Sequence, residues 1–309
     1  MNRCPITYQL CKQKYSIEGL KKLTPKLGTF CDLAYTAEEL RLESARRSGK
    51  MSIQGVQPKL SAILNIKDKR FDLVDMMGKF ILKPQHHIYP QLPENEDLTM
   101  HLASIAGIEV PLHGMIYSKD DSLTYYIKRF DRTGRKDKLA VEDFAQLAGL
   151  TRDTKYNYTI EKLIKLIEVS CTFPLVEKVK LFKRIIFNFL IGNEDMHLKN
   201  YSIIHRNYKI ELSPAYDFLN STIVLSGDIE ETALQIKGKK KNLNSKLLIN
   251  YLGSERMQLN SKVIKNILNE LTKAIPFWQD LIQNSFLSKN YKEDYLKLLN
   301  QRLQRLGMV

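Results

Sequence analysis

Short segments of apolar and other strand-forming residues predict strands in the first half of the chain. The predicted strands lie at 59–64, 71–74, 79–83, 115–117 and 123–128. A single helical pattern, 97–106, falls among them, with Pro93 before its acidic first turn and Gly107 at its end. We therefore expect a small strand-rich lobe in this half.

Helical spacing dominates from Val141 onward. The predicted helices cover 141–148, 159–169, 175–191, 258–273, 275–286 and 290–306. Between the third and the fourth of them, residues 201–204 and 208–212 predict a short hairpin. The pattern favours an α+β fold, in which a strand-rich N-terminal lobe, 1–128, precedes a mostly helical C-terminal lobe, 129–309.

The composition is that of an ordinary globular protein. Of 309 residues, 43% are hydrophobic and 27% are charged. No apolar run approaches the roughly 20 residues that a membrane-spanning helix needs, and the N-terminus lacks the apolar core of a secretion signal. The four cysteines form no C-x-x-C pair. We therefore expect reduced thiols, a cytoplasmic location and no membrane partner.

The net charge of +14 is concentrated in the second part of the chain. Residues 1–125 hold 17 Lys and Arg against 14 Asp and Glu, whereas the rest holds 31 against 20. This surplus indicates an acidic partner, such as a nucleic-acid-bound enzyme; a solvated lysine-rich surface explains it as well. Because zinc-finger spacing and RNA-binding aromatic motifs are missing, we expect no direct sequence-specific binding to DNA.

Three oxygen-bearing side chains have the spacing of a phosphoryl-transfer centre. Asn200 follows Asp195 by five residues, and Asp217 follows it by 22 across the predicted hairpin. In such a centre one carboxylate contacts the attacking hydroxyl, while an amide oxygen and a second carboxylate hold Mg²⁺ on the triphosphate. Lys199 would take part in catalysis by adding a positive charge near the γ-phosphate, where negative charge develops. The alternative is a polar turn that leads into an ordinary surface hairpin.

Candidate nucleotide contacts precede this centre in the expected order. Gly55 begins a turn, continued by Gln57 and Lys59, whose backbone N–H groups could cover phosphates. Lys83 ends a strand about 25 residues later, where a kinase lysine reaches the α- and β-phosphates. Its partner would be Glu94 or Glu96, with Glu96 preferred; either could instead serve the start of the next helix.

The segment 125–131 predicts a hinge strand. Backbone groups of Lys128 and Phe130 would bind adenine there. An edge strand with one core aromatic residue is the alternative interpretation.

Taken together, these segments resemble the HipA-like serine/threonine kinase toxins over roughly residues 50–300. The resemblance is specific because seven motifs occur in order. They are Met51 to Lys59, Ile81 to Pro84, Glu94 to Glu96, Lys128 to Arg132, Glu142 to Gln146, Gly192 to Asn200, and Pro214 to Asp217.

The resemblance implies a two-lobed protein-kinase-like fold, ATP and Mg²⁺ as cofactors, and the roles given above for the two aspartates and the asparagine. It also implies phosphate contact by Lys83 and a place in the ATP site for His197 and Lys199. Ser52 matches the loop serine that such kinases autophosphorylate, whereas Gln54 stands where some of them carry a second serine.

Longer HipA-like kinases carry an additional N-terminal subdomain, and only about 50 residues precede Ser52 here. The chain therefore resembles the shorter HipT-type toxins. That resemblance implies two partners, a small HipS-like protein and a HipB-like DNA-binding antitoxin.

The expected function is transfer of the γ-phosphoryl group of ATP to a serine or threonine of a cytosolic translation protein. The family comparison points to an aminoacyl-tRNA synthetase, whose inhibition would arrest growth and favour persistence. A small-molecule phosphotransferase with a kinase-like fold could use the same centre. A non-enzymatic nucleic-acid binder would explain the charge but not the motif.

Overall fold

The computed structural model describes residues 1–47, 57–134, 137–150, 156, 158–225 and 230–308. The chain forms two compact units, each described below by itself. The first consists of Met1–Leu98, Pro111–Asp137 and Asn284–Leu287, and the second of Thr99–Val110, Lys138–Gln283 and Ser288–Val309. The sequence placed one boundary after residue 128, whereas these units are each assembled from three segments.

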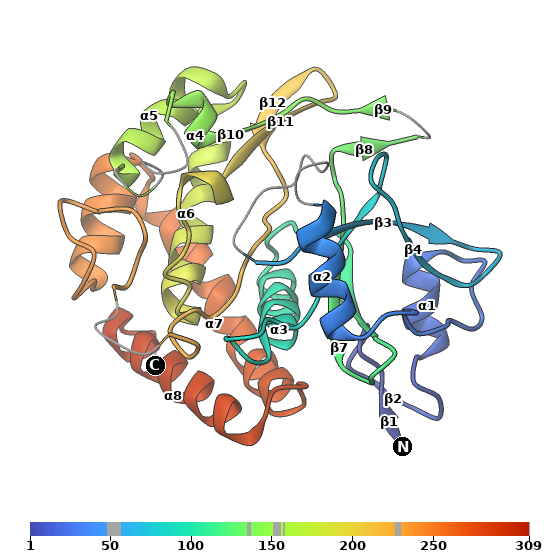
Figure 1. The fold of residues 1–309 in the computed structure, drawn as a ribbon. Coiled ribbons are helices and arrows are strands. Elements are labelled where there is room, and N and C mark those ends of the chain that lie inside the picture. Colours follow the sequence, from blue (N-terminus) through green and yellow to red (C-terminus); the bar gives the residue numbers. More distant parts are fainter. Residues whose placement is uncertain (48–56, 135–136, 151–155, 157, 226–229, 309) are drawn as a thin grey trace. The chain divides into compact units, whose positions relative to one another are not determined.

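An antiparallel sheet with the strand order β4-β3-β5-β7-β6 forms the centre of the first unit (Figure 1). Its strands are β3 (Leu60–Asn65), β4 (Arg70–Leu73), β5 (Phe80–Lys83), β6 (His113–Tyr117) and β7 (Leu123–Lys128). All five lie where the sequence predicted strands. The edge-to-face pair Phe71 of β4 and Phe80 of β5, with ring centroids 4.9 Å apart, joins two strands that flank β3 in the sheet.

The first 47 residues contribute to the core of the same unit. Their elements are β1 (Asn2–Arg3), β2 (Leu10–Cys11), α1 (Ile17–Leu23) and α2 (Ala37–Arg47). Ser16 caps α1 by accepting a hydrogen bond from the N–H of Gly19. Leu20, Leu33 and Leu40 are buried in one cluster with residues of β3 and β5. The N-terminal segment therefore completes the core beneath the sheet.

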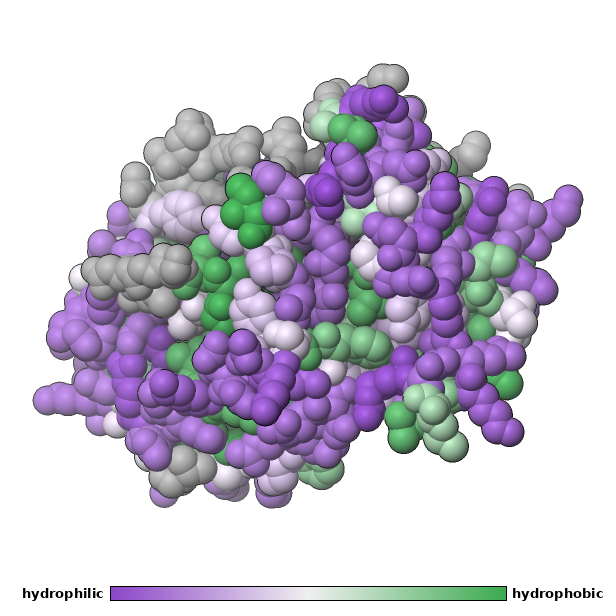
Figure 2. Space-filling model, turned by 60° about the horizontal axis from the view of Figure 1, so that its bottom comes forward, coloured by the Kyte–Doolittle hydropathy of each residue, from purple (hydrophilic) through white to green (hydrophobic). Residues whose placement is uncertain are grey.

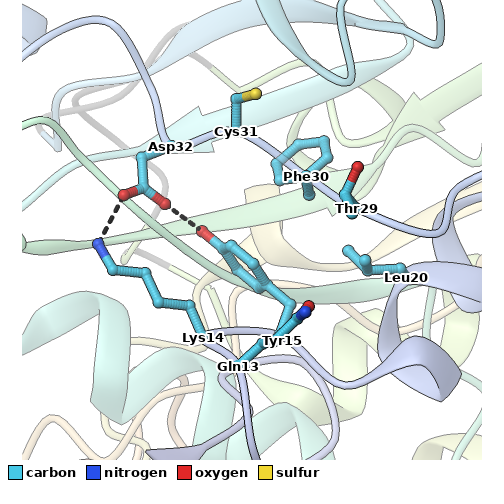
Figure 3. A pocket seen from close by; sticks show the side chains of 8 residues that line it. All are labelled: Gln13, Lys14, Tyr15, Leu20, Thr29, Phe30, Cys31 and Asp32. Carbon is cyan, nitrogen blue, oxygen red and sulfur yellow. Dashed lines mark hydrogen bonds and ion pairs between the residues drawn. The ribbon is translucent and has the colours of Figure 1, made fainter.

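A surface cavity of about 380 Å³ lies in this N-terminal segment (Figure 3). It is lined by Gln13, Lys14, Tyr15, Leu20, Thr29, Phe30, Cys31 and Asp32. Asp32 accepts hydrogen bonds from Lys14 at 2.6 Å and from the Tyr15 hydroxyl at 3.1 Å. Because this lining includes none of the described residues predicted to bind nucleotide or metal, the cavity is a separate feature.

Helices form most of the second unit (Figure 1). They are α4 (Phe144–Leu147), α5 (Ile160–Ser170), α6 (Pro174–Ile191), α7 (Ser261–Gln283) and α8 (Lys289–Leu306), with a π-helix at Lys246–Arg256 and a 3₁₀ turn at Leu198–Asn200. A three-stranded antiparallel sheet consists of β10 (Val141–Asp143), β11 (Ser202–Arg206) and β12 (Lys209–Leu212). Two short strands, β8 (Arg132–Thr133) and β9 (Asp137–Lys138), pair near the point where the chain leaves the first unit for the second. The helix α3 (Leu92–Ile105) contributes residues to both units.

Four predicted helices differ from the structure. Residues 141–148 form the strand β10 before the short helix α4, because residues 141–143 pair with β11. The helix predicted at 97–106 begins earlier, with Pro93 in its first turn, where proline needs no backbone partner. The two helices predicted at 258–273 and 275–286 are one helix, α7, which continues through Pro276. Burial of Ile275 and Trp278 offsets the hydrogen bond that proline removes.

On the face drawn in Figure 2, most side chains are hydrophilic and apolar ones occur in separate groups between them. Among the described helices, none combines the length and the apolar character that crossing a bilayer would require.

We expect Trp278→Ala to destabilise the protein by about 3–5 kcal/mol, the cost of removing a large aromatic side chain from a core. Trp278 is fully buried in the second unit, its Nε1 donates to the carbonyl of Leu102 at 2.9 Å, and its ring packs edge-on against Phe187. The measurement is urea unfolding. The neighbouring Phe277 is 65% exposed, so Phe277→Ala is the matched control and should unfold within about 0.5 kcal/mol of wild type. Equal effects of the two substitutions would contradict this assignment of the core.

Candidate active site

Gly192 ends α6 and directs the chain into the loop that carries Asp195. Its φ of +72° is the left-handed conformation that favours glycine. A Cβ at this position would lie 2.8 Å from the side-chain oxygens of both Asn220 and Thr222, and 2.4 Å from a methyl carbon of Leu298. Glycine is therefore required both by the conformation and by the close approach of the segment that follows Asp217.

Hydrogen bonds join the Asp195 loop to residues 221 and 222. The carbonyl of Gly192 accepts from the Ser221 hydroxyl at 3.2 Å, and from the backbone N–H and the hydroxyl of Thr222 at 3.2 and 3.0 Å. The backbone N–H of Glu194 donates to the Ser221 hydroxyl at 2.7 Å. These bonds hold the residue before Asp195 against the segment that follows Asp217.

Asn200 and Asp195 are linked within one turn. The Nδ2 of Asn200 donates to the carbonyl of Asp195 at 3.1 Å, and the backbone N–H of His197 donates to the same oxygen at 2.8 Å. Because the amide nitrogen of Asn200 serves the loop, its Oδ1 is the atom that can bind a cation. This orientation fits the predicted role of Asn200 as an oxygen ligand.

Tyr216, which precedes Asp217, is hydrogen-bonded to Lys199, which precedes Asn200, and so links the two predicted metal ligands. Its hydroxyl donates to the carbonyl of Lys199 at 3.0 Å and lies 2.5 Å from the Ser202 hydroxyl. Burial raises the pKa of Tyr216, so the phenol keeps its proton and remains a donor. Asp217 follows with a φ of +56°, an uncommon conformation for a residue other than glycine. The carboxylate of Asp217 and the amide oxygen of Asn200 are hard oxygen donors of the kind that Mg²⁺ prefers.

Tyr156 is a contact of Asp195 that the sequence analysis did not identify. Its hydroxyl donates to the Oδ1 of Asp195 at 2.5 Å, and its ring packs edge-on against the buried His197. The two hydrogen-bonded residues are 39 positions apart. No local pattern could have indicated this pairing.

Lys83 and Glu96 form a buried ion pair in the first unit. The Nζ of Lys83 lies 2.6 Å from Oε1 of Glu96, and the two side chains are 4% and 2% exposed. Glu94 instead accepts hydrogen bonds from Gln85 at 2.8 and 2.9 Å, and burial raises the pKa of its carboxyl to about 7. The preference for Glu96 over Glu94 as the partner of Lys83 is thus confirmed.

The remaining predicted nucleotide contacts have other partners or are not described. Ser44 on α2 hydrogen-bonds both the N–H and the carbonyl of Lys59, so this part of the predicted loop is held against α2. The N–H of Lys128 donates to the carbonyl of Leu112, and Phe130 is half-buried. Gln57 is half-buried as well. Two predicted site residues, Ser52 and Gly55, lie outside the described residues, and the adenine contact stays a prediction.

Glu194, the residue before Asp195, belongs to a network of charged side chains that includes Arg302 of α8. Its Oε1 lies 2.6 Å from the Thr222 hydroxyl and 4.0 Å from Arg302, which also lies 3.3 Å from Glu231 and stacks on the ring of Phe189. Burial raises the pKa of Glu194 to about 7. These contacts therefore connect the Asp195 loop to the last helix, α8.

We expect Lys83→Met to destabilise the protein by about 3–5 kcal/mol, because the carboxylate of Glu96 would then be buried without its cation. Urea unfolding measures the change. The double variant Lys83→Met/Glu96→Leu removes both charges and should recover most of the loss. A double variant no more stable than the single one would show that the pair itself does not account for the effect.

The pKa of Glu194 gives stability a defined pH dependence. Because its folded value of about 7 exceeds the ordinary value near 4.5, the folded state binds more protons between these limits. Its contribution to the free energy of unfolding is complete below pH 4.5 and is lost as the pH rises through 7. We expect Glu194→Gln to reduce the loss of stability between pH 5 and pH 8, measured by urea unfolding at both values. Glu293→Gln, at an exposed position, should retain the wild-type dependence; an identical dependence in both variants would contradict the prediction.

Comparisons with known proteins agree on a kinase-like relationship. A protein of Haemophilus influenzae, provisionally named a kinase, is 29% identical over all of this chain and 98% of its own length. The serine/threonine-protein kinase toxin HipA of Shewanella oneidensis is 28% identical over 55% of this chain, and the match spans 43% of that toxin.

Solved structures extend the similarity to the fold. The Shewanella oneidensis complex of HipA, HipB and operator DNA contains a chain that matches 91% of this one, with a TM-score of 0.70, 21% identity and 73% of its own length covered. The Helicobacter pylori proinflammatory kinase CtkA matches 79% of this chain, with a TM-score of 0.56, 15% identity and 90% of its own length covered. The predicted α+β, kinase-like fold class is confirmed. The sequence model of the HipA-like C-terminal domain matches residues 51–278, and the chain therefore belongs to that family.

Proposed function

We propose that this protein is an ATP-dependent serine/threonine protein kinase that acts as the toxin of a toxin–antitoxin system. The observation that carries the proposal is the arrangement of the Asp195 loop. The amide of Asn200 is tied to the Asp195 carbonyl, and Tyr216 joins the neighbours of Asn200 and Asp217. Family membership and the kinase names of its relatives support the same assignment.

In the proposed reaction, Asp195 accepts the proton of the attacking hydroxyl as that oxygen bonds to the γ-phosphorus of ATP. The bond between the γ-phosphorus and the bridging oxygen breaks, and ADP leaves. Lys199 offers positive charge where negative charge develops. Asn200 and Asp217 would hold Mg²⁺, which when bound neutralises charge on the phosphates.

In the first unit, Lys83 is the proposed phosphate contact, with Glu96 fixing its position. His197 and the backbone groups of Lys128 and Phe130 are assigned to the ATP site. We also propose autophosphorylation of Ser52. A phosphate there would add a charge of about −1.5 to −2 to the loop that carries Gly55, which would disfavour binding of the triphosphate.

The substrate and partners follow from the family and from the charge of the chain. We propose a cytosolic translation protein as substrate, with an aminoacyl-tRNA synthetase as the first candidate, because the basic second part of the chain favours an acidic or RNA-bound target. A HipB-like antitoxin is one proposed partner, since the structure of the relative contains HipB and operator DNA. A small HipS-like protein is the other, proposed from the resemblance to HipT-type toxins. DNA contact would come from the antitoxin.

The test is a comparison of wild type with Asp195→Asn and Asp217→Asn. We expect Asp195→Asn to lower phosphoryl transfer by roughly 10²–10⁴-fold, the usual contribution of a general base, while leaving Mg-ATP binding intact. Asp217→Asn should weaken Mg²⁺-dependent ATP binding as well. Calorimetry measures binding, and mass spectrometry of phosphoserine in expressing cells measures transfer.

The exposed Asp294 provides the control, and Asp294→Asn should match wild type in both measurements. Phosphate that accumulates on a free metabolite, and not on Ser52 or another protein, would favour the small-molecule phosphotransferase. Full biological activity of Asp195→Asn would contradict any enzymatic function.

A further inference from the structure

The carboxylate of Asp195 already holds a hydroxyl group that belongs to the chain itself. The phenol of Tyr156 donates to its Oδ1 at 2.5 Å. Burial and the adjacent Asp195 raise the pKa of Tyr156, so the phenol keeps the proton that it donates. The ring also packs edge-on against His197, with centroids 5.2 Å apart. Tyr156 therefore covers the loop with its ring as well as its oxygen.

This hydroxyl makes the same kind of contact with Asp195 that the proposed reaction requires of a substrate hydroxyl. A general base must lie within hydrogen-bond distance, about 2.6–3.2 Å, of the hydroxyl whose proton it accepts. A serine of a target protein and the phenol of Tyr156 would both donate to the carboxylate of Asp195. Binding of one hydroxyl therefore disfavours binding of the other.

The backbone of Asp195 has hydrogen-bond partners within its own loop. The backbone N–H of Asp195 donates to Asn193 at 3.3 Å, and its carbonyl accepts from His197 and Asn200. The hydroxyl of Tyr156 instead contacts the side-chain oxygen Oδ1, which belongs to the proposed reacting group.

We propose that Tyr156 is an internal substrate mimic. Its hydroxyl occupies the acceptor-hydroxyl position on Asp195, so an incoming hydroxyl must displace it before it can bind there. The proposal rests on the proposed kinase function and deepens it. Tyr156 thereby determines which acceptors can react. Only a hydroxyl group of a molecule that makes further contacts with the enzyme displaces the phenol.

The first test is Tyr156→Phe, which removes one oxygen and retains the ring that packs on His197. With the competing hydroxyl gone, we expect Mg-ATP hydrolysis, in which water is the acceptor, to rise about tenfold, the scale of one hydrogen bond to a charged group. The KM for dephosphorylated casein, a serine-bearing probe, should fall by a similar factor while the KM for ATP stays constant.

Tyr158→Phe is the matched control, because Tyr158 lies two positions away and its ring contacts Lys162. It should behave as wild type in both assays. If Tyr156→Phe lowers kcat, Tyr156 is a positioning residue and the proposal is overturned. Unchanged rates and KM values would also overturn it.

A second measurement does not depend on turnover. The ¹⁹F resonance of 3-fluorotyrosine at position 156 should shift when Asp195 is changed to Asn, and should not shift with Asp294→Asn. Insensitivity to Asp195→Asn would overturn the proposed contact. Wild type that neither binds nor hydrolyses Mg-ATP would remove the proposed function and this inference with it, whereas an active enzyme unaffected by Tyr156→Phe removes the inference alone.

Discussion

The carbonyl oxygen of Gly192 is the point on which the geometry of the Asp195 loop depends. Three donors from Ser221 and Thr222 meet at this one atom, and they join the end of α6 to the chain that follows Asp217. The oxygen is available because α6 ends here in a left-handed turn, which leaves the last carbonyls of the helix without partners in the helix. A requirement of helix termination thus also positions the two segments that carry the candidate catalytic and metal-binding side chains.

The two units hold their candidate residues by different physical means. In the second unit, neutral hydrogen bonds orient polar groups, as the hydroxyl of Tyr216 does with the carbonyl of Lys199 and the hydroxyl of Ser202. In the first unit, a buried pair of opposite charges holds Lys83 beside Glu96 at the end of β5. Hydrogen bonds fix direction at little electrostatic cost, whereas the ion pair is stable only while both members are present.

A feature could be predicted from the sequence when the residues that produce it lie close together along the chain. The strands of the first sheet follow from short local runs of strand-forming residues, and the roles suggested for Asp195 and Asn200 follow from spacing within one loop. The helix that passes through Pro276 was wrongly divided, because its continuity depends on burial of Trp278, which no local pattern contains. The contacts of Tyr156 and of Arg302 with the Asp195 loop were missed for the same reason: each joins segments that are distant in sequence.

The buried pair of Lys83 and Glu96 also has an evolutionary consequence. Loss of either partner removes the opposite charge from a buried group, so a lineage that changes one position first passes through a less stable intermediate. Replacement of the pair by two apolar residues would keep the fold but remove the ammonium group. A stable replacement therefore requires both positions to change, and it abandons whatever chemistry the lysine serves.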